Sequence, residues 1–180
     1  MELSYIFPDI PCQKAMPCQI FSRIGARPWG YCHVRIRNHM MQNIVGRKIM
    51  WGDLDPLGIV FYPRYYEWFD SCGHLFFETL GLNMGTIWSE RKVVFGLVET
   101  SCRYFKPARY RDLIRITTGI DKLGEKTLTL KHSLHSDPGA ALLAEGFEHR
   151  ICMNISDPEN LKAIRIPDDI YATLKKAQEG

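Results

Sequence analysis

The stretch 51–70 constrains this chain more than any other, because it joins two carboxylates, a turn and a helix start. Asp53 and Asp55 are two residues apart, so on an extended backbone their side chains would point to the same side. Pro56 and Gly58 then interrupt regular structure. The pattern predicts a loop that carries acidic groups and leads directly into a helix.

Helical spacing begins right after this loop. Pro63 suits the first turn of a helix, where its missing N–H costs no hydrogen bond. Gly81 marks a stop, and between them the apolar positions recur at helical intervals: Tyr65, Trp68, Phe69, Cys72, Phe76 and Leu80. A helix start offers unpaired N–H groups and a partial positive charge, so a carboxylate just before it resembles half an active site. The alternative is a strand–turn–helix in which the acidic side chains only cap the helix or face solvent.

The residues of this stretch match a known signature, Asp53-x-Asp55-x-x-Gly58-Ile59-Val60-Phe61-Tyr62-Pro63. In this order they resemble the 4-hydroxybenzoyl-CoA thioesterase family, one branch of the hotdog-fold acyl-CoA thioesterases. The similarity runs from around Met40 to Asp169, and residues 1–39 lie outside it.

The resemblance implies an enzyme that hydrolyses an acyl-CoA to a free acid and CoA, with no cofactor and no metal. Asp55 corresponds to the family's catalytic aspartate, which acts as nucleophile or general base, and the backbone amide of Tyr62 would polarise the thioester carbonyl. Asp53 is expected only to orient the turn. An aromatic acyl group similar to 4-hydroxybenzoyl is favoured. The alternatives are a short- or medium-chain aliphatic acyl-CoA thioesterase and a non-catalytic acyl-CoA-binding hotdog protein.

Five further positions are expected to contact the acyl-CoA substrate. Gly58 would let the substrate approach the loop, while Trp68 and Asp70 on the helix would reach the acyl group. Lys126 and Thr127 lie at the turn where the family holds the CoA phosphates. Only Lys126 remains of the family's basic run there, and a single lysine supplies one point charge.

Other polar residues are interpreted as structural or solvent-facing. His132 and His149 fall within strands, where a histidine with satisfied hydrogen bonds is expected. Glu67 and Asp70 are second choices for the catalytic acid, because other hotdog thioesterases carry theirs on the helix. Four cations could compensate for the missing basic run but are expected to be solvated on the surface: Arg103, Arg109, Lys122 and Arg150.

The remaining chain alternates between apolar and polar residues as strands do. We expect strands at 43–51, 93–105, 113–123, 127–136 and 141–153, a connecting segment with one helical turn at 83–92, and a final helix at 170–177. This order predicts an α+β fold, a curved antiparallel five-stranded sheet wrapped around one long helix, with a short C-terminal helix. One helix cannot cover such a sheet, and its edge strands would stay exposed, so a homo-oligomer is expected. The resemblance implies a hotdog dimer with a continuous sheet, usually paired into a tetramer.

Residues 1–39 differ in composition from the rest. Prolines interrupt every periodic segment, and cations outnumber acids. We expect an extension without regular structure, or an over-long gene start with the natural start at Met40 or Met41, followed by a hotdog domain at 40–180. Zinc-ligand spacing is absent from its cysteines and histidines, which are Cys12, Cys18, Cys32, His33 and His39.

Composition sets broad limits on the function. A chain of 180 residues with 46% hydrophobic residues suits one globular domain, and no apolar run approaches a membrane span. The net charge of +3 gives little support to nucleic-acid or membrane binding. The six cysteines form no paired motif, which indicates reduced thiols in a cytoplasmic protein.

Overall fold

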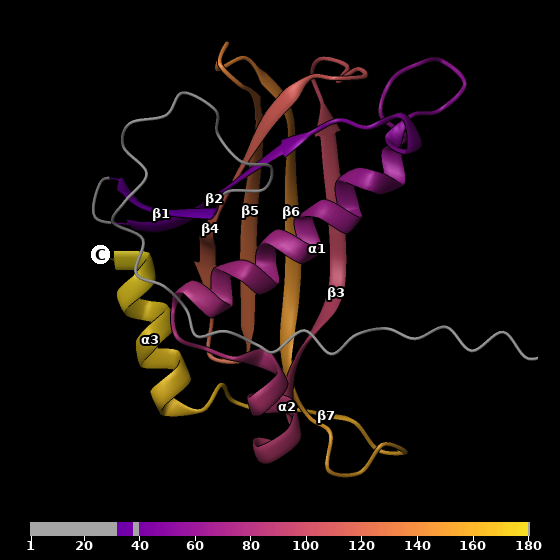
Figure 1. Cartoon of the computed structure of the whole chain (residues 1–180). Coiled ribbons are helices and arrows are strands. Elements are labelled where there is room, and N and C mark those ends of the chain that lie inside the picture. Colours follow the sequence, from indigo (N-terminus) through magenta and orange to yellow (C-terminus); the bar gives the residue numbers. More distant parts are fainter. Residues whose placement is uncertain (1–31, 38–39, 180) are drawn as a thin grey trace, which may run out of the picture.

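The computed structural model describes residues 32–37 and 40–179, which form one α+β unit (Figure 1). Its elements in chain order are β1 (Cys32–Arg37), β2 (Met40–Lys48), the 3₁₀ helix η1 (Trp51–Asp53), α1 (Tyr62–Thr79), α2 (Met84–Arg91), β3 (Val93–Tyr104), β4 (Leu113–Leu123), β5 (Thr127–Ser136), β6 (Leu142–Asn154), β7 (Lys162–Ala163) and α3 (Asp168–Glu179). The predicted α+β class is confirmed.

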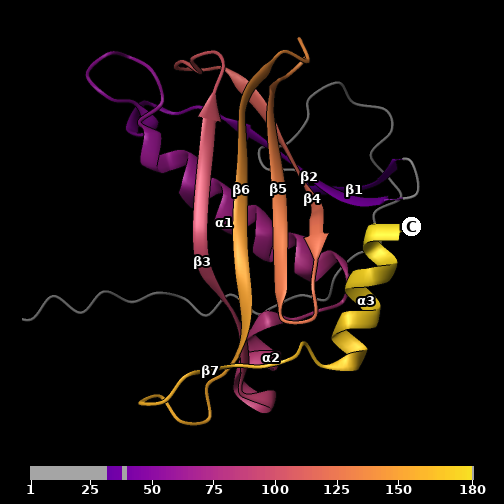
Figure 2. The same cartoon turned by 180° about the vertical axis from the view of Figure 1, so that it is seen from behind.

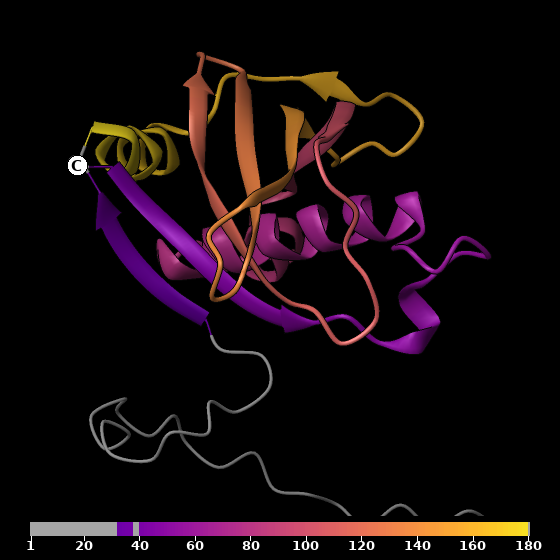
Figure 3. The same cartoon turned by 90° about the horizontal axis from the view of Figure 1, so that it is seen from above.

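The strands form one antiparallel sheet in the order β1-β2-β4-β5-β6-β3, and the short β7 adds to β6. Seen from above, the sheet curves around α1 (Figure 3). Seen from behind, no helix of the described chain covers the opposite face of the sheet (Figure 2). At the side of the sheet, α3 packs against β2 and β4. The long helix therefore fills most of the concave face, and α2 and α3 complete the core at one end, where Ile87, Ile170 and Leu174 pack in one cluster with Phe76 and Phe77.

The helix α1 forms because its apolar residues fall on the face toward the sheet. Phe69, Phe76 and Phe77 are fully buried there. The sheet approaches closely at Gly146 of β6, where an added Cβ would lie 2.2 Å from a ring carbon of Phe69. The helix ends just before Gly81, whose φ of +75° is accessible to glycine without strain. Packing against β6 thus sets how closely α1 lies on the sheet.

Most predicted elements are present, with three differences. The strands β4 and β5 have the predicted bounds. The first strand lies earlier than predicted, at Met40–Lys48, because the chain after it turns into η1. The segment before β3 forms a full helix, α2, since the Asn83 side chain caps it by accepting the Thr86 N–H at 2.9 Å. The sheet has seven strands instead of five, because β1 and β7 are added.

One of the added strands, β1, lies within the predicted extension 1–39. It pairs antiparallel with β2 from Cys32 opposite Val45 to Arg37 opposite Met40. The predicted boundary before Met40 therefore falls inside a hairpin. Residues 1–31 and 38–39 lie outside the described residues, and so do the side chains of Cys32 and His33, so the five potential zinc ligands of the extension all fall outside them. Within the described chain, no helix is long and apolar enough to cross a membrane.

Candidate active site

The loop between η1 and α1 carries Asp55 and is closed by its own backbone hydrogen bonds. The Asp55 N–H donates to the Ile59 carbonyl at 2.9 Å, and the Gly58 N–H donates to the Asp55 carbonyl at 3.0 Å. Gly58 has a φ of +71°, which side chains with a Cβ rarely adopt, and nothing lies within 4 Å of the position of an added Cβ. The Asp55 Oδ1 atom accepts the Leu57 N–H at 2.8 Å. This tight loop fixes the position of the carboxylate.

The start of α1 presents a free backbone N–H beside this loop. Phe61, the N-cap residue, donates its N–H to the Asp53 carbonyl at 2.8 Å, and Pro63 has no N–H. The N–H of Tyr62 is one of the first-turn groups that a helix leaves unpaired, and it has no backbone acceptor within the described chain. Together with the positive end of the helix dipole, it can stabilise negative charge on a carbonyl oxygen.

Asp55 and Tyr62 line the same cavity, which has a volume of about 470 Å³. Its walls come from the Asp55 loop, the first turn of α1 and the segment after β3, and they consist of Asp55, Ile59, Val60, Tyr62, Tyr65, Tyr104, Phe105, Lys106 and Pro107. Burial raises the pKa of Tyr65 to about 12, so its phenol is protonated at neutral pH. A mostly apolar cavity with one carboxylate, one lysine and one free N–H suits a carbonyl compound.

Asp53 has a different environment from Asp55. It is 6% exposed, and its Oδ2 atom accepts the Met50 N–H at 2.8 Å while its Oδ1 atom accepts from the Arg47 guanidinium at 3.2 Å. The two residues do not lie on one extended strand, because Asp53 ends η1 and Asp55 follows in the loop, so their carboxylates have different partners. No group of three or more potential metal-binding side chains occurs in residues 40–179.

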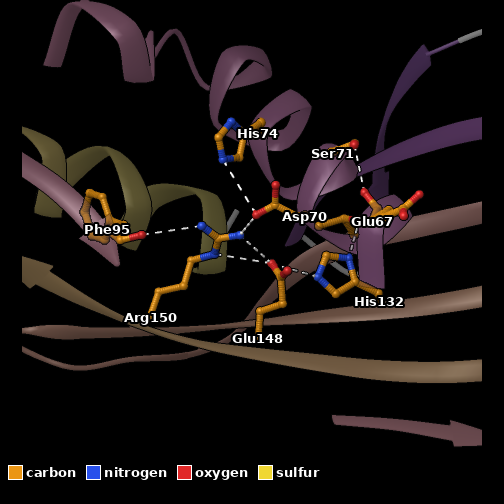
Figure 4. Close-up of polar contacts among 9 residues, drawn as sticks. Glu67, Asp70, Ser71, His74, Phe95, His132, Glu148 and Arg150 are labelled. Atoms are coloured by element: carbon orange, nitrogen blue, oxygen red, sulfur yellow. Dashed lines mark hydrogen bonds and ion pairs between the residues drawn. The ribbon is translucent and has the colours of Figure 1, made fainter. Parts of the chain in front are cut away.

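Asp70 lies farther along α1, where it meets a buried chain of charged groups (Figure 4). The Arg150 Nη2 atom donates to Asp70 Oδ1 at 2.6 Å and to Glu148 Oε2 at 2.9 Å. Arg150 and Glu148 are 4% and 1% exposed, whereas the Asp70 side chain is 52% exposed. The expectation that Arg150 is a solvated surface cation is wrong, because β6 turns this residue inward beneath α1. The sequence signal for this inward position is the spacing of Gly146, Glu148 and Arg150 along β6. Residues two apart on a strand lie on the same face of the sheet.

His132 completes this buried network. Its Nδ1 atom lies 2.9 Å from the Thr118 hydroxyl, and its ring stacks on Phe69 with centroids 4.8 Å apart. Burial lowers the pKa of His132 below its ordinary value, although Glu148 Oε2 lies 3.4 Å from Nε2. Burial alone would raise the pKa of Glu148, but His132 and Arg150 outweigh it and lower that pKa. The network thus holds a neutral imidazole beside an ionised carboxylate and guanidinium.

Comparison with known proteins identifies the family. The sequence model described as "Thioesterase-like superfamily" matches residues 49–174. The chain is 33% identical over 131 residues to 4-hydroxybenzoyl-CoA thioesterase from Pseudomonas sp. strain CBS-3, covering 68% of this chain and 90% of that protein. The chain belongs to the thioesterase-like superfamily. It is a thioester hydrolase of the acyl-CoA thioesterase class.

Solved structures of related thioesterases have the same fold. A mutant of 4-hydroxybenzoyl-CoA thioesterase in complex with 4-hydroxybenzoyl-CoA superposes with a TM-score of 0.67 at 30% identity, covering 74% of this chain and 97% of that one. A gentisyl-coenzyme A thioesterase superposes with a TM-score of 0.62 at 31% identity, covering 71% and 98%. These matches confirm the predicted hotdog fold.

In this thioesterase, Trp68 does not share a cavity with Asp55. It lines a second cavity of about 450 Å³ between β2 and α1, where the Arg47 guanidinium lies 4.4 Å from its ring centroid. Trp68 and Asp70 are two residues apart on a helix, about 200° around its axis, so they face different sides of α1.

Lys126 and Thr127 are also separated from Asp55. They lie where β4 turns into β5, at the opposite end of the sheet from the Asp55 loop (Figures 1 and 2). Lys126 is exposed, and its carbonyl accepts the Cys152 N–H at 2.8 Å. One chain of this thioesterase therefore does not bring the predicted phosphate contact next to the predicted catalytic carboxylate.

Proposed function

We propose that this thioesterase hydrolyses an acyl-CoA whose acyl group is a hydroxylated aromatic acid, with Asp55 and the Tyr62 amide as its catalytic groups. The observation that carries the proposal is that a carboxylate with few partners and a free helix-start N–H line one cavity. Asp53 has the same chemistry in principle, but its carboxylate is occupied by Met50 and Arg47. Asp55 is therefore the carboxylate available to a substrate.

The reaction needs attack on the thioester carbonyl and stabilisation of the oxyanion that results. The Tyr62 N–H would donate to that oxygen. In one route the Asp55 carboxylate attacks the carbonyl carbon, the carbon–sulfur bond breaks, CoA leaves as a thiolate, and water cleaves the mixed anhydride. In the other, Asp55 removes a proton from the water that attacks. Both routes convert acyl-CoA and water into a free acid and CoA.

The preference for a hydroxylated aromatic acyl group rests on the relatives and on the cavity. Two related thioesterases of 30% identity or more have names that specify a hydroxylated benzoyl group, 4-hydroxybenzoyl in one and gentisyl in the other. The cavity carries the aromatic side chains of Tyr62, Tyr65, Tyr104 and Phe105, which can stack on an aromatic ring. Asp70 is our candidate for a polar contact to the acyl group, since Arg150 fixes one of its oxygens while the side chain stays half exposed.

The site is proposed to work in a homodimer, the unit from which a tetramer could be built. The strand β3 ends the sheet, and its residues from Leu97 onward are largely exposed, including Leu97 at 48% and Val98 at 61%. An open edge of this length can pair with the same edge of a second copy. A second chain could then bring its own Lys126 and Thr127 toward Asp55, which one chain does not do.

We propose the cytoplasm as the location of this enzyme. Cys72, Cys102 and Cys152 form no disulfide within the described chain, which supports a reducing compartment. The proposed substrate is also a soluble thioester, so the function requires no contact with a membrane or with nucleic acid.

Replacing Asp55 by Asn tests the proposed chemistry. We expect kcat to fall on the order of a hundredfold or more with little change in KM, because an amide neither attacks nor accepts a proton. The assay follows thiol release from 4-hydroxybenzoyl-CoA, gentisyl-CoA, and short- and medium-chain acyl-CoA thioesters. In the control Asp53→Asn, the loss should appear in thermal stability more than in kcat, since Asp53 holds η1 together.

The same assay decides between the candidate functions. Faster turnover of aliphatic than of aromatic thioesters would replace the proposed acyl group by an aliphatic one. Tight acyl-CoA binding without thiol release would indicate a non-catalytic binding protein. Near-normal turnover by Asp55→Asn would show that another group performs the chemistry.

A further inference from the structure

A cluster of unpaired cations lies beside the Asp55 loop. The segment 103–111 contains four cations and no acid: Arg103, Lys106, Arg109 and Arg111. All four are exposed, and none has a carboxylate partner within 4.0 Å in the described chain. Elsewhere arginines pair with acids, as Arg64 does with Glu67 and Arg91 with Asp169. The segment therefore carries an excess of positive charge, which favours the binding of an anion.

The segment that carries these cations is fixed to the proposed catalytic loop. Ile59 and Arg109 form an antiparallel bridge, and the Val60 N–H donates to the Ala108 carbonyl at 3.0 Å. Residues opposite each other in such a bridge project their side chains to the same side. Ile59 and Lys106 line the cavity of Asp55, and Arg109, although it is not a lining residue, lies next to it as the bridge partner of Ile59. An anion held here would be continuous with a substrate in the cavity.

Arg111 occupies a backbone conformation that does not favour it. Its φ is +71°, a region where glycine or asparagine is ordinarily found and where other side chains are strained. The conformation is held by hydrogen bonds on both sides, from Arg111 N–H to the Ile49 carbonyl at 3.0 Å and from Asp112 N–H to the Arg109 carbonyl at 3.1 Å. The backbone thus holds an arginine at a position where glycine would be less strained.

Two exposed aromatic side chains complete the surface. Trp51 is 75% exposed and meets Tyr110 edge-on, with centroids 5.7 Å apart. The Arg111 guanidinium lies 5.5 Å from the centroid of the Tyr110 ring. Exposed aromatic faces next to guanidinium groups are the combination that holds a purine by stacking and its phosphates by charge-assisted hydrogen bonds.

We propose that Trp51, Arg109, Tyr110 and Arg111 bind the phosphorylated adenosine end of CoA on the same chain that carries Asp55. This inference rests on the proposed function, because it assigns the carrier half of the same substrate. The turn at Lys126 lies at the far end of the sheet in the same chain and supplies a single lysine, so it could add at most one charge, and only from a second copy. The nucleotide anchor and the catalytic loop then belong to one rigid surface.

Kinetics with two thioesters of one acid tests the anchor. We compare an acyl-CoA with the acyl-pantetheine, which lacks the nucleotide. Arg109→Gln and Arg111→Gly should each raise KM for the acyl-CoA about fivefold, and together about twentyfold, as exposed ionic contacts do. The kcat values and the KM for acyl-pantetheine should stay unchanged, since the contact is the same in ground and transition states. Lys176→Gln, an exposed cation on α3, is the matched control.

Arg111→Gly separates binding from folding. Glycine fits a φ of +71°, so this variant should be at least as stable as the natural chain while it binds CoA more weakly. A structural role for Arg111 would instead lower the melting temperature. Arg111→Lys, which keeps the charge, should recover part of the affinity.

Direct binding keeps this inference distinct from the proposed hydrolysis. Adenosine 3′,5′-bisphosphate should quench Trp51 fluorescence, with the signal lost in Trp51→Phe and the affinity lowered in Arg109→Gln. If this binding occurs while no thioester is cleaved, the anchor stands and the proposed hydrolysis fails. Equal KM values for acyl-CoA and acyl-pantetheine would overturn the anchor while hydrolysis stands. It is equally overturned if only Lys126→Gln weakens CoA binding, or if a single-stranded oligonucleotide binds more tightly than CoA.

Discussion

Replacing Arg150 by Met should destabilise the fold more than removing any surface ion pair. Methionine has a similar length but no charge, so it leaves Glu148 buried at 1% exposure with no cation beside it. Asp70 and the Phe95 carbonyl also lose their contacts with the guanidinium, at 2.6 and 3.4 Å. Removing one partner of a buried ion pair costs about 3–5 kcal/mol. For a chain of this length that corresponds to a fall in Tm of about 6–20 °C.

The assay is thermal or urea unfolding, with two comparisons built on the structure. Arg91→Met removes an exposed bidentate pair with Asp169, at 2.7 and 2.9 Å, and should cost less than about 1 kcal/mol. The double variant Arg150→Met with Glu148→Gln should recover much of the loss, because no unpaired charge remains. Equal costs for Arg150→Met and Arg91→Met, or no recovery in the double variant, would refute this account of the network.

The pH dependence of the same comparison follows from Glu148. In the natural chain the pKa of Glu148 is below its ordinary value near 4.5, so its contribution to stability is complete above that value and is lost as the pH falls through the lowered pKa. Without Arg150, burial would raise that pKa instead. The difference in unfolding free energy between the two proteins should therefore shrink as the pH falls from neutrality toward 4.

Three other perturbations have definite expected outcomes. Gly146→Ala would place a Cβ 2.2 Å from Phe69 and should cost about 1–3 kcal/mol in urea unfolding, whereas Gly52→Ala, with nothing within 4 Å, should be nearly neutral; equal effects would contradict the close packing. Because the pKa of His132 is lowered, unfolding free energy should fall as the pH drops below about 6.5, and His132→Gln should flatten that slope; an unchanged slope would assign it elsewhere. A chain beginning at Met40 should fold and keep its activity, since β2 still pairs with β4, but should unfold at a lower temperature without β1; loss of folding would show that the extension belongs to the domain.

The sequence predicts the parts of the fold that rest on periodicity. Alternation along 113–123 and 127–136 gives both bounds of β4 and β5, because each strand buries one face against α1. The 3.6-residue spacing after Pro63 likewise predicts α1. The elements that periodicity does not predict depend on other interactions. The helix α2 depends on the cap at Asn83, and β1 depends on pairing with β2 across a hairpin, neither of which periodicity reports.

The candidate site also has a part that the sequence predicts and a part that it does not. Asp55, Gly58 and Tyr62 are close in sequence, so their motif predicts them as a unit and the structure keeps them in one loop and helix start. The contact of Asp70 with Arg150 spans 80 residues and joins a helix to a strand, so no local pattern predicts it. In the sequence, Glu148 and Arg150 appear only as charged residues at inward-facing positions of β6. A charge at such a position indicates a buried partner.

The hydrogen bonds of the Asp55 loop have a consequence for how such enzymes diversify. The bonds from Asp55 to Ile59, from Gly58 to Asp55 and from Phe61 to Asp53 all lie within this one segment, and the bond from Val60 to Ala108 that ties it to a cavity wall is also between backbone atoms, so the proposed catalytic carboxylate and the Tyr62 amide keep their spacing without help from the side chains of the walls. Walls contributed by the segment after β3 can then be exchanged one side chain at a time. A lineage could change the acid it releases while inheriting the chemical step intact.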